Sequence, residues 1–318
     1  MHKKFVRIED FLGEKSARFF SNGYKRAIRS ISDVVITASG TESVCSVSLP
    51  ADWSVKGGAR QIAHLSSIDA LLIALQLSEA YCVVAYALTA SMRKEITISS
   101  FSMKAGKEPL ENLENFKATV TLSSIAGAIY SFVSDVGGMV VELKLQLPFA
   151  CHPVVFPKEG VRYDAIDTIL GKSGNNFYGA GFADVSHDIT DVMVDLDASS
   201  VTAKFEGAFP KRTPYQGMET MFDHHVSPID AMVVLSQLGQ CYLYLLDGIS
   251  RANSSTLWMR AMTFSTTDPP VNDTSLACIE VVRSERILVE EKPWRCVNMK
   301  GSMGGMNIFY ALGHALPF

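Results

Sequence analysis

The sequence predicts an α+β protein in two similar units, each an antiparallel sheet wrapped around one long buried helix. Three observations lead to this prediction. The stretch HLSSIDALLIALQLSEAY at residues 64–81 returns as HVSPIDAMVVLSQLGQCY at residues 225–242. Both stretches are apolar on nearly every side, as a helix buried in a core is. Segments in which apolar and polar residues alternate lie around each stretch, which is the pattern of strands.

Further matches extend the repeat over the chain. FLGEKSARFFSNGY (11–24) lies over ILGKSGNNFYGAGF (169–182), and ISDVVI (31–36) lies over ITDVMV (189–194). Near the ends of the units, GGMVVELKLQLP (137–148) meets GGMNIFYALGHALP (304–317). The matches keep their order, so we interpret the chain as a tandem duplication.

Each unit is predicted to contain the same elements in the same order. A short amphipathic segment opens it, with Phe11, Phe19 and Phe20 in the first unit. A hairpin follows, because apolar residues alternate on both sides of an SG turn in the first unit and an ASS turn in the second. The long helix comes next, and three more strands close the unit. These strands are EITISSFSMK, NFKATVTLSS and GMVVELKLQLP in the first unit, and LWMRAMTFST, LACIEVVRSE and MNIFYALGH in the second.

The predicted boundaries place the first unit at residues 1–150, a linker at 151–163 and the second unit at 164–318. The stretch PFACHPVVFPKEG, which carries three prolines, lies between the units and has the composition of a connection. One buried helix with several antiparallel strands describes the hotdog fold. Two such units in one chain predict a tandem double hotdog, whose two sheets join edge to edge.

The composition argues against several classes of function. The net charge is -4 and no basic patch stands out, so we expect no nucleic-acid partner. The apolar stretches carry Asp69 and Asp230, which are costly in lipid, so we expect no membrane span. The six cysteines form no CxxC pair and no secretory signal is visible, which predicts free thiols in the cytoplasm. Only the adjacent His224 and His225 have a spacing that metal ligands could use, so we expect no metal site.

Both long helices have a complete structural start signal. Ser66 is predicted to be the N-cap of the first helix, with Asp69 at N3. In the second helix Ser227 is the N-cap, Pro228 is at N1 and Asp230 is at N3. A carboxylate at N3 also interacts favourably with the positive end of the helix dipole. These structural roles alone could account for both aspartates.

The alternative is a chemical role. Free N–H groups at the start of a buried helix could polarise a thioester carbonyl, as an oxyanion hole does. His225 and His64, just before the caps, could act as general bases, or could simply bond to a turn carbonyl. Asp230 and Asp69 could orient these histidines or move a proton. We expect His225 and Asp230 in one catalytic centre, and His64 and Asp69 in another or in a degenerate one.

Five further residues are candidates for substrate contacts: Asp223, His224, Trp53, Gln237 and Glu79. His224 could equally be a solvent-exposed loop residue. Gln237 could instead be a buried residue that hydrogen-bonds to the sheet. Glu79 stands where the second unit has Gln240, so the two units differ at this position.

The sequence resembles the avirulence protein D family of plant-pathogenic and other bacteria over nearly its whole length. The resemblance rests on IEDFLGEKSARFFSNGYKR, LPADWSVK, HLSSIDALLIALQLSEAY and the FSMKAG segment. It implies an enzyme of syringolide synthesis, which joins a β-ketoacyl chain from an acyl thioester to a pentulose such as xylulose. The hotdog proteins of A-factor (γ-butyrolactone) biosynthesis are similar, because they are double hotdogs that join a β-ketoacyl donor to a small hydroxyketone acceptor. The resemblance carries over no catalytic residues.

A second resemblance is partial. HxxxxDA at 64–70 and at 225–231 is similar to the HPxxLDAxxQ segment of polyketide synthase dehydratase domains. Those domains also carry HxxxGxxxxP, but Ile68 and Ile73 follow His64 where Gly and Pro would stand. This departure disfavours a dehydratase of the usual kind.

We therefore predict an acyltransferase that condenses a β-ketoacyl thioester with a small sugar or polyol. The thioester is expected on CoA or acyl carrier protein, and no other cofactor is expected. His225 or His64 would deprotonate the acceptor hydroxyl. The alternatives are a hotdog dehydratase, hydratase or thioesterase, or a non-enzymatic module that binds acyl chains or lactones. A homodimer is left open.

Overall fold

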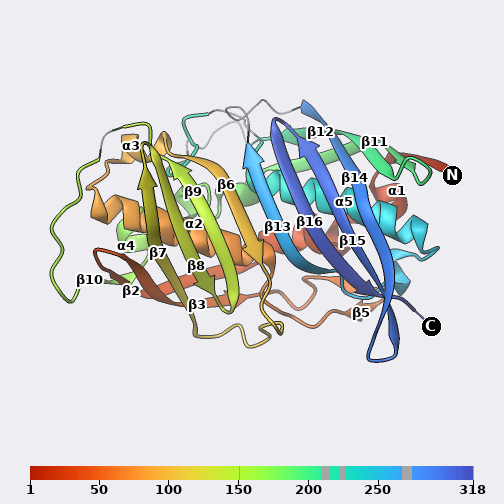
Figure 1. Cartoon of the computed structure of the whole chain (residues 1–318), viewed down its shortest axis with the longest axis horizontal. Coiled ribbons are helices and arrows are strands. Elements are labelled where there is room, and N and C mark those ends of the chain that lie inside the picture. Colours follow the sequence, from red (N-terminus) through yellow and green to blue (C-terminus); the bar gives the residue numbers. More distant parts are fainter. Residues whose placement is uncertain (150, 210–214, 223–225, 267–273, 318) are drawn as a thin grey trace.

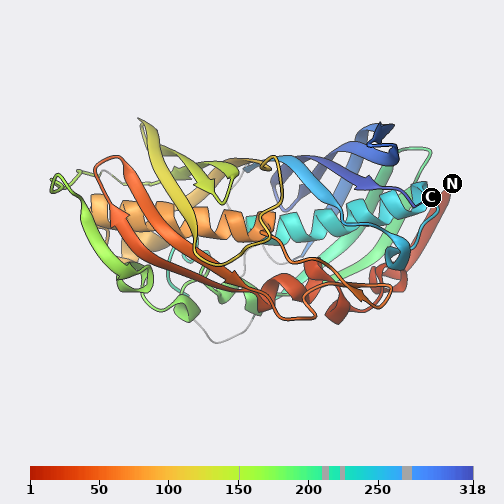
Figure 2. The ribbon, with the colours of Figure 1, turned by 90° about the horizontal axis from the view of Figure 1, so that it is seen from below.

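The structure, a computed structural model, describes residues 1–149, 151–209, 215–222, 226–266 and 274–317. Within them one antiparallel sheet of 14 strands runs in the order β1-β11-β12-β14-β15-β16-β13-β6-β9-β8-β7-β3-β2-β10. The sheet curves around two long helices, α2 (Ser67–Ala85) and α5 (Pro228–Leu246), as Figure 1 shows. Figure 2 shows these helices lying end to end along the molecule. This is the expected arrangement of a sheet around buried helices.

The two halves of the sheet have the same strand order, counted outward from the β6–β13 pair at the centre. The first half contains β6 (Thr97–Lys104), β9 (Met139–Gln146), β8 (Ile129–Val136), β7 (Phe116–Ala126), β3 (Gly40–Ser48) and β2 (Ile28–Ile36). The second half contains β13 (Trp258–Thr266), β16 (Met306–Ala315), β15 (Lys292–Met303), β14 (Thr274–Val289), β12 (Ser200–Ala208) and β11 (Ser186–Asp195).

Two of the strands that close the units were not expected from the sequence. The prediction of three closing strands per unit is wrong, because β8 and β15 add a fourth to each half. In the first half the turn between β7 and β8 is only residues 127–128, so the two strands merge into one stretch of sequence. Gly137 and Gly138 form the next turn with φ of 56° and 86°, conformations that favour glycine.

The opening segments of the two halves are exchanged. Strand β1 (His2–Arg7) pairs with β11 of the second half, and β10 (Val161–Ala165) pairs with β2 of the first. The short helix α1 (Glu9–Leu12) and the π-helical turn Phe19–Gly23 pack on α5, whereas α4 (Asp167–Leu170) packs on α2. Each half of the sheet is therefore completed by chain from the other unit, and β10 begins inside the predicted linker.

The remaining short elements connect these parts. In the described part of the chain they are the helix α3 (Ala90–Lys94), the two-residue strands β4 (Val55–Lys56) and β5 (Ala59–Arg60), and five 3-10 turns. The turns are Lys15–Ala17, Tyr24–Arg26, Ser173–Asn175, Gly181–Asp184 and Arg251–Asn253.

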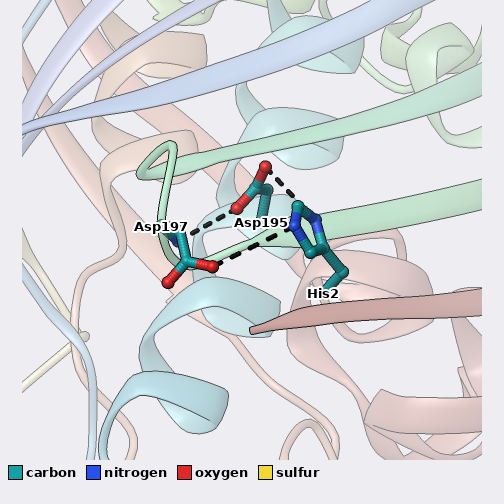
Figure 3. Close-up of side chains that lie close together, drawn as sticks. All are labelled: His2, Asp195 and Asp197. Atoms are coloured by element: carbon teal, nitrogen blue, oxygen red, sulfur yellow. Dashed lines mark hydrogen bonds and ion pairs between the residues drawn. The ribbon is translucent and has the colours of Figure 1, made fainter.

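Three polar side chains fasten the edge strand β1 (Figure 3). His2 Nδ1 lies 3.2 Å from Asp195 Oδ2, and His2 Nε2 lies 4.0 Å from Asp197 Oδ2. The amino group of Met1 pairs with the same Asp197 carboxylate at 2.5 Å. Among the described residues this is the one three-residue group with spacing suited to a metal ion. Because the group is largely exposed, we interpret it as a set of ion pairs that holds the end of β1 against β11.

The predicted start signals of both long helices are confirmed. The hydroxyl of Ser66 accepts the N–H of Asp69 at 3.1 Å, and Asp69 accepts the N–H of Ser66 at 3.3 Å. Ser227 and Asp230 form the same capping box, at 3.2 and 2.8 Å, with Pro228 as the first helical residue. Both helices are long and apolar enough to cross a membrane. However, 89% of the most apolar 18-residue stretch of α2 and 83% of that of α5 are buried inside the protein.

Candidate functional site

A cavity of about 290 Å³ lies at the start of α2 and is the candidate functional site. Both halves of the chain line it. The first half contributes residues 18–20, the loop and short strands at 53–61, and residues 64–67 at the helix start. The second half contributes Gln240 of α5, Arg251, residues 256–260 and Trp294. A site of this kind is complete only when the two halves are joined.

His64 lies in this cavity, as does Trp53. The imidazole is 5.7 Å from the Trp53 ring, edge to face, and 4.8 Å from the ring of Trp258 on β13. Its Nδ1 lies 3.0 Å from the carbonyl oxygen of Ile62. Because a carbonyl can only accept, Nδ1 carries the proton, and Nε2 of the neutral ring is left as an acceptor. The two indoles and the carbonyl therefore fix a ring whose Nε2 has no hydrogen-bond partner among the described residues.

The start of α2 faces the same cavity. Ser66 and Ser67 both line it. The N–H groups of Ser67 and Ile68, the first two helical positions, have no acceptor within the helix. Together with the helix dipole they favour negative charge at this point. The cavity therefore combines a candidate base with candidate donors for a developing oxyanion.

Among the described residues, Asp69 has contacts to Arg29 and Ser66 and none to His64. The Asp69 carboxylate is fully buried and forms an ion pair with Arg29 of β2, with Nη2 and Oδ1 2.6 Å apart. Its other oxygen accepts the Ser66 hydroxyl at 2.6 Å. At N3 the side chain folds back onto the N-cap and the strand, whereas His64 precedes the cap. Asp69 therefore belongs to the support of the helix start.

Asp230 has the equivalent position in the second half, and its partner is His187 of β11. His187 Nε2 and Asp230 Oδ1 are 2.6 Å apart, with side-chain exposures of 6% and 2%. Burial alone would raise the pKa of Asp230, but the hydrogen bond and charge of His187 and the bonds from Ser227 hold it below its usual value. The predicted partner His225 lies outside the described residues, as do Asp223 and His224.

Aromatic contacts join the two helix starts. The rings of Tyr24 and Phe182 are stacked, with centroids 6.0 Å apart. The guanidinium of Arg29 lies 5.3 Å from the Phe182 ring. Burial raises the pKa of Tyr24 well above its usual value, and the nearby negative charge of Asp230 raises it further. The pairs Arg29–Asp69 and His187–Asp230 thus flank one buried centre between the halves.

Neither of the two predicted polar contacts from the long helices reaches the cavity. Glu79 is buried and pairs with Arg93 of α3, with Oε1 and Nε 2.9 Å apart. Arg93 also donates to the carbonyl of Leu170, which ties α4 to α2. Gln237 accepts from Arg18 Nη1 at 2.5 Å and donates to the carbonyl of Phe20 at 3.0 Å. Both side chains hold the exchanged opening segments and line neither cavity described here.

Five cationic residues that line the cavity were not predicted: Arg18, Lys56, Arg251 and the exposed Lys107 and Arg260. Burial, helped by the neighbouring charge of Arg251, lowers the pKa of Lys56 to about 8. Burial also lowers the pKa of Arg18, against the opposing effect of Glu9. Their loops are far apart in the sequence, so only the folded chain brings them together. Arg29 and His187, by contrast, occupy equivalent positions in the repeat. Arg29 lies two residues before the first isoleucine of ISDVVI, and His187 lies two residues before the first isoleucine of ITDVMV. This alignment could have identified both residues from the sequence.

A second cavity, of about 400 Å³, lies at the start of α5. Its described lining includes Val226, Pro228 and residues 97–99 of β6, the counterparts of the first cavity's helix start and β13. That lining also holds Glu95 and Glu219 and contains no histidine, lysine or arginine among the described residues. The first cavity is therefore the one in which described residues supply a base and cations.

The sequence matches the Pseudomonas avirulence D protein (AvrD) family over residues 3–317. The chain belongs to this family. The resemblance found in the sequence is thereby confirmed. No curated protein matches the chain.

The comparison with solved structures found similar chains at low identity. A TesB protein of Mycobacterium avium subspecies paratuberculosis is 9% identical, with 87% of this chain and 93% of that chain covered and a TM-score of 0.45. A 12:0-ACP thioesterase from Umbellularia californica is 10% identical, with 78% and 87% covered and a TM-score of 0.40. An acyl-ACP thioesterase from Bacteroides thetaiotaomicron is 9% identical, with 78% and 90% covered and a TM-score of 0.37.

Proposed function

We propose that this AvrD-family chain is a tandem double hotdog acyltransferase whose active site is the cavity at the start of α2. It transfers an acyl or β-ketoacyl group from a CoA or carrier-protein thioester to a small sugar or polyol, in syringolide-type synthesis. The observation that carries the proposal is the position of His64. Its free Nε2 belongs to a cavity that also contains the start of a buried helix and is lined by both halves.

The proposed reaction has one base and one oxyanion site. The thioester carbonyl oxygen lies against the N–H groups of Ser67 and Ile68, where negative charge is favoured. His64 Nε2 takes the proton of an acceptor hydroxyl, and that oxygen attacks the thioester carbon. The carbon–sulfur bond breaks, and the departing sulfur receives the proton from His64. The products are an ester and a free thiol, and no further cofactor is needed.

The apolar part of the lining suits an acyl chain. Phe19, Phe20 and Leu65 line the cavity together with Met139 and Leu257. Trp53 and Trp258 hold the base and cover part of the wall, which would exclude water from the reacting centre. Exclusion of water is what separates transfer to a polyol from hydrolysis of the same thioester.

We also propose that the protein works in the cytoplasm. All six cysteines are free, and Cys45, Cys82 and Cys241 are buried. Free thiols persist in a reducing compartment, which is also where CoA thioesters and acyl carrier proteins are found. Fractionation of cells that express a tagged chain would test this.

The test is thiol release from a β-ketoacyl-CoA, with and without D-xylulose, followed by mass spectrometry of the product. His64→Ala is expected to lower acceptor-dependent release by about 10²–10⁴-fold, the usual contribution of a general base. His152→Ala is the matched control, because His152 is exposed and lies outside the cavity. His225→Ala tests the other predicted centre.

Each result has a definite meaning. Release that requires xylulose and yields a new ester supports the transferase. Release by water alone would make the protein a thioesterase instead. No release from any thioester would overturn the enzymatic proposal, and full activity of His64→Ala would overturn the assigned base.

A further inference from the structure

We propose that the interior of this cavity binds a phosphate ester through Lys56 and Arg251, beside Arg18, and that the acceptor sugar carries this phosphate. The inference rests on the proposed function, because it names the class of acceptor. It goes beyond that function by assigning a binding site to three cationic residues.

The three cations come from different elements and meet inside the cavity. Lys56 ends β4, is 9% exposed, and donates through Nζ to the carbonyl of Ser255. Arg251 opens a 3-10 turn and donates through Nη2 to the carbonyl of Ala17 at 2.7 Å. Arg18 is 2% exposed, and its Nε has no hydrogen-bond partner among the described residues.

Two of the three positive charges, those of Lys56 and Arg251, have no ion-pair partner among the described residues, although Glu108, which is exposed, also lines the cavity. Arg18 pairs with Glu9, whose Oε1 is 2.6 Å from Nη2. Among the described residues, no carboxylate oxygen lies within 4.0 Å of the charged nitrogens of Lys56 or Arg251. Burial lowers the pKa of Arg251, and the charge of Arg18 lowers it further. Buried charge of one sign is unfavourable without a partner, so an anion that entered here would be stabilised.

A phosphate group suits these donors better than a carboxylate does. Its several oxygens can accept from an ammonium and from guanidinium groups at the same time. The start of α2, on the same cavity, adds the positive end of the helix dipole. Lys56 and Arg251 each retain donors beyond their single bond to a backbone carbonyl, so the site has unused hydrogen-bonding capacity.

The position of the cations favours the acceptor as the source of the phosphate. A volume of about 290 Å³ lies at the small end of ligand sites, too small for the nucleotide of CoA beside an acyl chain. CoA would leave its phosphates at the surface, and Lys107 and Arg260 are exposed residues of the cavity lining. Lys56, Arg251 and Arg18 are therefore matched to a small phosphorylated sugar in the cavity that His64 also lines.

The experiment is calorimetric binding to the full chain, without any thioester. The ligands are D-xylulose 5-phosphate, D-xylulose, CoA and pantetheine. We expect the sugar phosphate to bind at least about tenfold more tightly than the sugar, and Lys56→Met to remove this preference. Lys204→Met is the matched control, because Lys204 is exposed and pairs with Asp191 on the outer strands. Lys56→Arg should restore binding if the charge is what matters.

The outcomes separate the two phosphate sources. Equal affinity for xylulose and its phosphate would overturn the proposal. If Lys56→Met weakens CoA relative to pantetheine and leaves the sugar phosphate unaffected, the phosphate belongs to the donor and the acceptor assignment falls. Because no thioester is present, binding can succeed while thiol release fails, which would reject the transferase but keep the phosphate site. An unchanged thermal midpoint of Lys56→Met excludes misfolding as the cause of lost binding.

Discussion

At the scale of single residues, the cavity contains one base that the sequence indicated and several cations that it did not, Lys56 among them. His64 stood in a repeated segment just before a helix cap, so its place at the helix start followed from local pattern. Lys56 is ordinary in the sequence, and its environment arises from Ser255 and Arg251 of the other half. Non-local burial of this kind cannot be read from spacing along the chain.

Lys56 leads to a prediction about pH. Its pKa of about 8 means that the ammonium is mostly present at pH 7 and mostly lost at pH 9. Arg251 and Arg18 face it from the second half and from the opening segment, and both stay protonated. Affinity for D-xylulose 5-phosphate should therefore fall as pH rises above about 8, by up to about tenfold per unit.

Calorimetry from pH 6.5 to 9.5 measures this dependence. The variant Lys56→Arg keeps its charge over the whole range, so its affinity should stay nearly constant. A wild-type affinity that is equally constant above pH 8 would contradict the assigned role of the Lys56 ammonium.

At the scale of elements, the sequence predicted both helix starts but did not predict the residues that pair with Asp69 and Asp230. The capping boxes at Ser66 and Ser227 were predictable because both members lie within one helical turn. The contacts from β2 and β11 to Asp69 and Asp230 join residues about 40 positions apart. The missed strands β8 and β15 have a different cause, since hairpin turns this short leave little trace in an alternating pattern.

The ion pairs Arg29–Asp69 and His187–Asp230 should respond differently when their aspartate is replaced by alanine. Asp69→Ala leaves the buried Arg29 charged, since a guanidinium does not lose its proton, and should cost about 3–5 kcal/mol of unfolding free energy. Asp230→Ala leaves His187, which can become neutral, and should cost only about 1–3 kcal/mol. Urea unfolding at pH 7.5 measures both, with the exposed Asp191→Ala as control. Equal losses would show that neutralisation of His187 does not relieve the cost.

At the scale of the whole molecule, the repeat predicted two units, and the structure interleaves them. Strands β1 and β10 each complete the sheet of the opposite half. The β6–β13 pair then joins the halves into one sheet. The sequence carried no sign of this exchange, because a strand pattern does not say which edge the strand will join. The cavity follows from the same arrangement, since Trp53 and Trp258 approach His64 from different halves.

The exchange predicts how the chain behaves when it is cut. The segment from Cys151 to Gly160 contains no strand and is largely exposed, so a protease site inserted between Val154 and Val155 should be cleaved in the native protein. The two fragments should stay together, because each supplies an edge strand and an opening segment to the other. Size-exclusion chromatography of the cut protein should show one species of unchanged size, which separates only in denaturant.

The separate fragments give the opposite expectation. A chain of residues 1–154 lacks β10 and α4, so β2 would be an open edge and α2 would lose part of its cover. Expressed alone, each fragment should aggregate or lack a cooperative unfolding transition, and refolding the two together should restore both the transition and the cavity. A soluble, cooperatively folded single fragment would show instead that each unit is an independent domain and that the exchanged strands contribute little to its stability.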